Sequence, residues 1–240
     1  MSRALAMATA LALLLLPASA CAQTQTQLKV RLRPDRPRAL ATLEISIRYE
    51  DPQAAVPEPL RRALLRLPEG LNVEVPRLRS CSPRALRAHG PKACPPASVL
   101  GGGSALAKAQ AGSQILSEHV TLTTVLGPLV GLQPTFDVFA QGYTPFGQRE
   151  LLSGTIVPDE PPYGEDMALT VPPIATLPLE PDVSIAALTL TIGPPAGSRR
   201  HAANAVIVPA HCPKGGLPFA VRTGFADGTT STATTSIPCP

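Results

Sequence analysis

Residues 27–33 read Gln-Leu-Lys-Val-Arg-Leu-Arg, with a polar side chain at every odd number and an aliphatic one at every even number. Such alternation indicates a half-buried β-strand, because successive side chains of a strand point to opposite faces. Residues 42–49 repeat the pattern as Thr-Leu-Glu-Ile-Ser-Ile-Arg-Tyr. The fold therefore begins with two amphipathic strands.

Similar short segments follow through the 240-residue chain, and clusters of its 29 Pro and 18 Gly separate them. Because an interior proline costs a helix about 3 kcal/mol, long helices are disfavoured. Residues 60–67 suit a short helix or a strand. Asp227-Gly228 is typical of a hairpin turn. We expect further strands at 71–75, 104–108, 119–126, 135–141, 150–157, 166–171, 183–192, 205–208, 217–225 and 231–237.

This pattern predicts an all-β fold, namely an antiparallel β-sandwich of Ig-like or jelly-roll-like type over residues 28–240. If this domain is subdivided, we expect the boundary near residues 101–112, where the net charge of the chain changes sign. One short helix is expected, with Ser82 as its N-cap, Pro83 at the first helical position and Gly90 just after its end. Gly101-Gly102-Gly103 indicates tight backbone packing or a bulge.

Residues 1–22 have the order of a secretory signal peptide: Arg3, an apolar run over 4–16, Pro17, then small residues. Cleavage after Ala22 leaves Gln23 first, and cleavage after Ala20 leaves Cys21 first, as a candidate for lipidation. Residues 23–27 are expected to form a short tether. The run is too short for a membrane span, and no later stretch qualifies. We expect a secreted or cell-surface protein.

Four further cysteines, Cys81, Cys94, Cys212 and Cys239, are expected to form disulfides in an oxidising compartment. Proximity in sequence favours Cys81–Cys94 and Cys212–Cys239, although four cysteines allow three pairings. The alternative is a zinc site that uses His89 or His211, but C-x-x-C spacing is missing. We expect no metal and no cofactor.

The net charge of +4 is unevenly distributed. Residues 23–110 carry fifteen basic and seven acidic side chains, whereas residues 111–240 carry five and ten. The arginines at 31–38, 61–66 and 77–87 fit either solvated strand faces or binding to an anionic envelope polymer. Nucleic acid is not expected as a partner, because aromatic residues are not interleaved with the basic ones.

Asp159, Glu160, Glu165 and Asp166 are the acids considered for hydrolysis or Ca²⁺ binding, with an acidic solvated loop as the alternative. No G-x-S-x-G motif or phosphate-binding glycine loop occurs, and His89, His119, His201 and His211 are expected on the surface. Half of the eight aromatic residues lie at 136, 139, 143 and 146. They suit the core better than a ligand groove.

The segment from Cys94 to Ala105, with Pro95, Ser98, Gly101 and Gly103, resembles a CPxxSxxGxGxA-like segment. Together with the late Cys212-Pro213, it resembles uncharacterised exported β-rich proteins of high-GC Gram-positive bacteria. This resemblance implies export and a disulfide-held β fold, and no reaction. We expect a non-enzymatic protein with a binding or structural role in the cell envelope, whose partner is an anionic polymer or another surface protein. The alternative is a secreted hydrolase that uses the 159–166 acids.

Overall fold

The computed structural model describes residues 23–73, 79–145, 147–175, 181–193 and 206–239. The predicted signal peptide, with Cys21, lies outside these residues. The helical elements are α1 (Pro83–His89), η2 (Pro91–Ala93) and η3 (Pro96–Ser98). The strands are β1 (Gln25–Arg33), β2 (Leu40–Glu50), β3 (Leu60–Pro68), β4 (Asn72–Val73), β5 (Val99–Ala111), β6 (Gln114–Leu126), β7 (Thr135–Gln141), β8 (Arg149–Pro158), β9 (Tyr163–Thr170), β10 (Ser184–Ile192), β11 (Val206–Ile207), β12 (Leu217–Phe225) and β13 (Thr230–Ile237).

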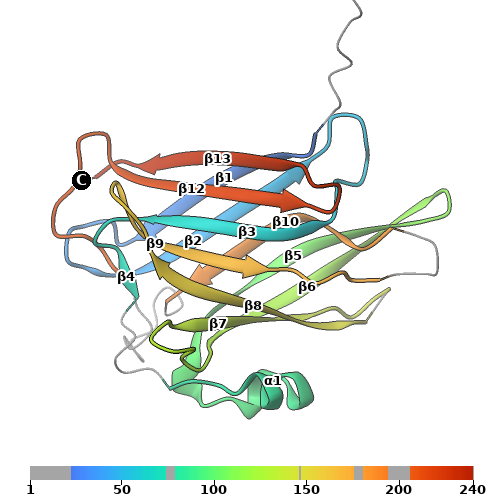
Figure 1. The fold of residues 1–240 in the computed structure, drawn as a ribbon, viewed down its shortest axis with the longest axis horizontal. Helices are drawn as coiled ribbons and strands as arrows, with labels where there is room; N and C mark the ends of the chain where they lie inside the picture. The colour runs from blue at the N-terminus through green and yellow to red at the C-terminus, as the bar shows by residue number, and fades with distance from the viewer. Residues whose placement is uncertain (1–22, 74–78, 146, 176–180, 194–205, 240) are drawn as a thin grey trace, which may run out of the picture.

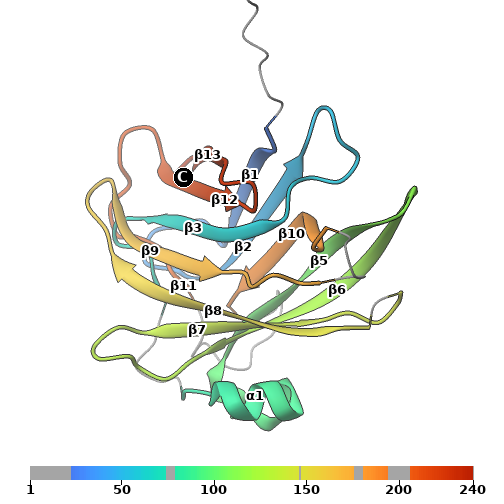
Figure 2. The same ribbon diagram turned by 45° about the vertical axis from the view of Figure 1, so that its right-hand side comes forward.

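The strands form one continuous antiparallel sheet. Hydrogen-bonded neighbours follow the order β13-β12-β3-β9-β8-β7-β6-β5-β10-β2-β11-β4, and β1 pairs with β2. Twist accumulates over so many strands, so the sheet curls until β1 lies close to β12 and β13 (Figures 1 and 2). The predicted all-β antiparallel class is confirmed. The strand order describes a single curled sheet, however, and not the two separately paired sheets of the predicted sandwich.

Two boundaries differ from the sequence-based expectation. Residues 25–27, predicted to be a tether, belong to β1, where Thr26 is buried against the sheet. The interval 101–112 is no break in the fold, because β5 runs through it and pairs with both β6 and β10. The ambiguous segment 60–67 is strand β3, which pairs with β9 and β12.

The core lies on the concave face of the curled sheet. In β2, Leu43, Ile45, Ile47 and Tyr49 are each at most 4% exposed, as the alternation predicted. The Tyr49 ring packs edge-on against Phe225, with 6.0 Å between ring centroids. Burial raises the pKa of the Tyr49 hydroxyl well above its usual value.

The two edges of the sheet meet at a seam between β1 and β13. The backbone N–H of Thr26 donates to the Ser231 hydroxyl at 3.1 Å, and the Thr26 and Thr223 hydroxyls lie 2.9 Å apart. The Thr223 hydroxyl also donates to the Ser231 carbonyl at 3.2 Å. In the described part of the chain, the two edges are therefore joined by hydrogen bonds that involve side chains, and not by a backbone ladder.

Helix α1 covers part of the convex face and is held there by a disulfide. Cys81 and Cys94 lie at disulfide distance, with 5.1 Å between their Cα atoms. Leu86 of the helix is fully buried beside Phe139 and Val125, in a small second core. The predicted helix is confirmed, and Gly90 has the expected positive φ of 73°, but the Ser82 side chain makes no capping hydrogen bond.

Gly101 and Gly103 allow β5 and β10 to approach closely. A Cβ atom at Gly101 would come within 1.8 Å of the Thr191 carbonyl oxygen, and one at Gly103 within 1.9 Å of the Thr189 carbonyl oxygen. Real Cβ atoms do not approach so closely, so the glycines are required by the backbone packing, as the sequence indicated.

A second disulfide ties the start of β12 to the end of β13. Cys212 and Cys239 lie at disulfide distance, with 6.0 Å between their Cα atoms. The β12–β13 hairpin turns at the predicted Asp227-Gly228, where the Asp227 carboxylate accepts from the Thr229 N–H at 2.9 Å. The pairing that sequence proximity favoured is thus the one in the structure.

Candidate functional site

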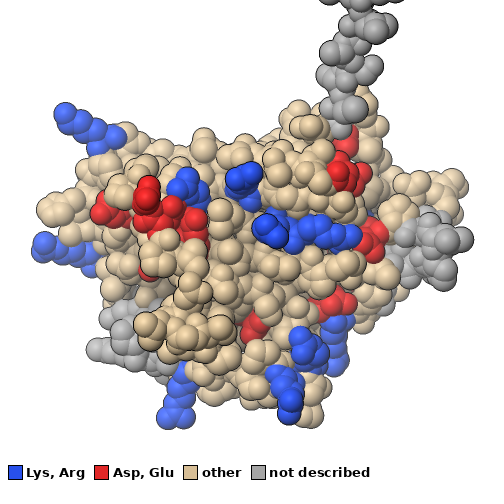
Figure 3. Space-filling model, viewed as in Figure 1, with Lys and Arg blue, Asp and Glu red and all other residues tan. Residues whose placement is uncertain are grey.

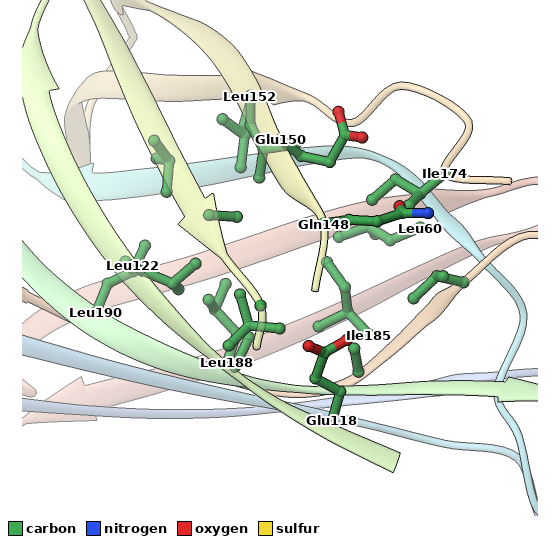
Figure 4. Close-up of a pocket in the computed structure, with 18 residues that line it drawn as sticks. Leu60, Glu118, Leu122, Gln148, Glu150, Leu152, Ile174, Ile185, Leu188 and Leu190 are labelled. Atoms are coloured by element: carbon green, nitrogen blue, oxygen red, sulfur yellow. The ribbon is translucent and has the colours of Figure 1, made fainter. Parts of the chain in front are cut away.

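An aliphatic pocket opens on the concave face of the sheet, between strands β3, β5, β6, β7, β8, β9 and β10. Its cavity volume is about 80 Å³ (Figure 4). Of its eighteen lining residues, all but Glu118, Gln148 and Glu150 are aliphatic or glycine. Several aliphatic residues here are only half-buried, among them Val120, Ile174 and Ile185. The pocket is therefore a preformed apolar site with a small polar component.

Small residues create this space. Ala105 and Ala107 of β5, Ala140 of β7 and Gly142 just after β7 all line the pocket. Elsewhere on the concave face the same strands carry Leu, Val and Phe. Because Ala and Gly fill so little volume, the facing side chains do not meet, and a cavity remains.

An irregularity in β10 adds a further aliphatic wall. The register of β10 against β5 shifts between Ile185 and Ala187. A bulge of this kind reverses the side-chain alternation. As a result Ile185 lines the same pocket as Leu188 and Leu190, although it is three positions from Leu188. The bulge re-aims one large side chain into the site.

Glu118 brings a carboxylate into this apolar surface. It lies on β6 in line with Val120 and Leu122, at a position where the alternation calls for an apolar side chain, and it is only 4% exposed. One of its oxygens accepts from the Gly147 N–H at 3.3 Å. A Cβ atom at Gly142 would lie 2.4 Å from that same oxygen, so glycine makes room for the carboxylate.

Glu150 and Gln148 complete the polar part of the pocket. Burial raises the pKa of the Glu150 carboxyl, and the charge of Arg87 partly opposes this. The Gln148 side-chain amide donates to the Ala175 carbonyl at 3.3 Å. In Figure 4, Glu118 and Glu150 enter the pocket from opposite sides. Neither glutamate belongs to the site residues predicted from the sequence, although each occupies an apolar-face position of its strand.

Two of the acids considered for hydrolysis, Asp159 and Asp166, hold an arginine on the opposite face, whereas Glu165 pairs with the core residue Leu67. Arg66 donates through Nε to Asp159 at 2.7 Å and lies 3.5 Å from Asp166, while its guanidinium sits 4.1 Å from the centroid of the Tyr163 ring. Arg66 and Asp166 are directly paired across β3 and β9. Glu160 is exposed and Glu165 is half-buried.

This cluster has a distinctive electrostatic arrangement. Burial and the neighbouring Asp159 raise the pKa of Asp166 to about 6. Burial alone would raise the pKa of Asp159 as well, but hydrogen bonds from the Glu160 N–H and from Arg66 outweigh it and lower that pKa. The two aspartates converge on Arg66, which occupies the space that a substrate would need between them.

The other candidate residues are dispersed. His89, His119 and His211 are exposed, and His201 lies outside the described residues. Within the described ranges, no group of three His, Cys, Asp or Glu side chains is arranged to hold a metal ion. Phe136 and Phe139 are buried in two different clusters, Tyr143 is 65% exposed, and Phe146 lies outside the described part of the chain. These aromatics therefore do not form one groove.

The arginines do not gather into one patch on the face shown in Figure 3, where basic groups alternate with acidic side chains. Arg31 lies 3.5 Å from Glu44, and Arg61 pairs with Asp182. Arg77 is outside the described residues. Among the helices that the structure describes, none is long and apolar enough to cross a membrane.

No protein-family model, curated protein or solved structure matches this chain.

Proposed function

We propose that this protein is an exported binding protein that holds a small aliphatic molecule, or the end of an aliphatic chain, in the pocket of its curled sheet. The main support for this proposal is the cavity, which is lined by aliphatic side chains and shaped by Ala140, Gly142 and the β10 bulge. Burying apolar ligand surface there provides about 25 cal/mol per Å² of driving force. The two disulfides, Cys81–Cys94 and Cys212–Cys239, support the export part of the proposal, because disulfides persist in oxidising compartments.

The alternative, a hydrolase using the 159–166 acids, receives less support. Asp159 and Asp166 form ion pairs with Arg66 instead of facing an open cleft. The anionic-polymer alternative is likewise less favoured, since the basic side chains on the visible face lie in separate groups (Figure 3). A binding role without catalysis therefore remains the better proposal, with an apolar rather than a polyanionic ligand.

The test is a titration with 1-pentanol, followed by methyl NMR of the full exported chain. We expect saturable shifts at Ile185 and Leu188 and none at Leu132, which is 95% exposed. Ala140→Leu should weaken binding at least tenfold by filling the cavity.

The matched control is Ala187→Leu, which adds the same group on the outer face, where Ala187 pairs with the exposed Arg48. This variant should bind 1-pentanol like the wild type. Shifts that never saturate, or that survive Ala140→Leu, would show that the cavity is not a binding site.

A further inference from the structure

We propose that the ligand of the pocket carries a cationic, hydrogen-bond-donating group, such as a primary ammonium, and that Glu118 binds this group. The inference rests on the proposed function and specifies its ligand class. The ligand class is an aliphatic amine and not an aliphatic acid.

Glu118 is a buried carboxylate with unused hydrogen-bonding capacity. A carboxylate accepts about four hydrogen bonds, and the one recorded for Glu118 within the described chain is the 3.3 Å contact from the Gly147 N–H. The side chain is 4% exposed. Desolvated charges are costly unless they are paired, so the site is complete only when a donor occupies it.

Among the described residues, none that lines the pocket is Lys, Arg or His. The other polar residues of the lining are Glu150 and Gln148. None of the ion pairs recorded for the described residues includes Glu118. Both charged groups of the lining are acidic, and they reach the cavity from β6 and β8 (Figure 4).

This charge pattern discriminates among amphiphiles with the same tail. An ammonium group can donate to the Glu118 carboxylate while its alkyl chain contacts Val120, Ile185 and Leu188. A carboxylate head would face two acidic groups in an apolar environment, where like charges repel strongly. An alcohol donates one hydrogen bond without charge, so it should bind between these extremes.

The cavity also limits the ligand's size. A cavity of 150 Å³ accommodates benzene in another protein, and this one measures about 80 Å³. A short unbranched chain, or the end of a longer one, therefore fits best. The five-carbon series of n-pentylamine, 1-pentanol and pentanoate changes the head group while keeping the tail nearly constant.

The experiment compares these three probes by calorimetry and methyl NMR. We expect n-pentylamine to bind roughly ten- to a hundredfold more tightly than 1-pentanol, as a charged hydrogen bond in place of a neutral one implies, and pentanoate to bind more weakly than both. The side-chain carboxyl carbon of Glu118 should shift with n-pentylamine and not with pentanoate.

Glu118→Gln should bring the amine and alcohol affinities within about threefold of each other, while Glu160→Gln, at an exposed acid of the same chain, should leave the preference unchanged. If the Glu118→Gln variant still binds 1-pentanol, its pocket is intact. If the variant does not fold, the shift of the Glu118 carboxyl carbon in the wild type tests whether Glu118 binds the amine.

Equal affinity of the wild type for amine and alcohol would overturn this inference and leave the proposed function standing. An amine preference that survives Glu118→Gln, or is accompanied by no shift of the Glu118 carbon, would overturn the role of Glu118. Absence of binding by all three probes would overturn both proposals.

Discussion

Arg66 influences the pKa values of the two aspartates that contact it. Three partners surround its guanidinium: Asp159, Asp166 and the Tyr163 ring. Burial and the neighbouring Asp159 raise the pKa of Asp166 to about 6, whereas hydrogen bonds from the Glu160 N–H and from Arg66 lower the pKa of Asp159. The cluster is thus a pH-dependent element of stability on the outer face, away from the pocket.

Asp166→Asn should gain stability relative to the wild type as pH rises from 4 to 7. A carboxyl whose pKa is raised in the folded state contributes stability below its unfolded pKa, near 4, and this contribution is lost as pH rises through about 6. Asparagine does not ionise, so it avoids the loss, which is at most about 3 kcal/mol for a shift of this size. Denaturant unfolding at several pH values measures the difference.

Asp159→Asn is the matched control. Because the pKa of Asp159 is lowered in the folded state, its contribution is present above the unfolded pKa and is lost as pH falls. This variant should therefore become less stable relative to the wild type as pH rises. A stability difference that does not change with pH in either variant would contradict the described cluster.

At the scale of elements, α1 is the segment least able to exist alone. Its seven residues are too few for an isolated helix, and its one fully buried side chain is Leu86. The Cys81–Cys94 disulfide and the hydrogen bond from the Cys81 N–H to the Leu126 carbonyl at 2.8 Å fix it to the sheet. The covalent link replaces the extensive packing that a longer helix would have.

Replacing both Cys81 and Cys94 with Ala should destabilise the protein by about 3 kcal/mol, since the bridge closes a loop over a sequence separation of 13. We expect the Cys81 amide to lose hydrogen-exchange protection first. Binding of 1-pentanol should stay within twofold of the wild type, because α1 covers the convex face and the pocket lies on the other. A loss of pocket binding in the folded variant would show that the two faces are coupled.

The elements were largely predictable and their arrangement was not. Alternation located β1 and β2 to within two residues, because each buries one face only. The pocket depends on features that alternation ignores: small residues at 105, 107 and 140, and a bulge between 185 and 187. Glu118 was predictable in principle, because it is an acidic residue at an apolar-face position of β6. The acids at 159–166 were predicted as candidates instead because they lie close together in sequence.

At the scale of the whole molecule, the β1–β13 seam completes the curled sheet. Thr26 and Thr223 are buried there, and their hydroxyls lie 2.9 Å apart. Because the Thr223 hydroxyl donates to the Ser231 carbonyl, the Thr26 hydroxyl acts as the donor to Thr223. Two side chains far apart in sequence thus form one buried polar chain.

Thr26→Val and Thr223→Val should each destabilise the protein by about 1–2 kcal/mol, because each leaves a buried group without its partner. The double variant should cost less than the sum of the two, since it removes both ends of the same hydrogen bond. Denaturant unfolding of the four proteins measures this coupling. Additive losses would indicate that the seam is not formed in solution.

The seam also has a consequence for the order in which the protein is made. Thr26 and Ser231, which it joins, are 205 positions apart. While the ribosome adds the residues between them, the edge of β1 that later lies against β13 has no neighbour, and β2 is still without β10. Such edges invite pairing with other chains. Until the β12–β13 hairpin is made, the edge of β1 is therefore open to other chains, and in the finished fold that hairpin covers it through side-chain hydrogen bonds.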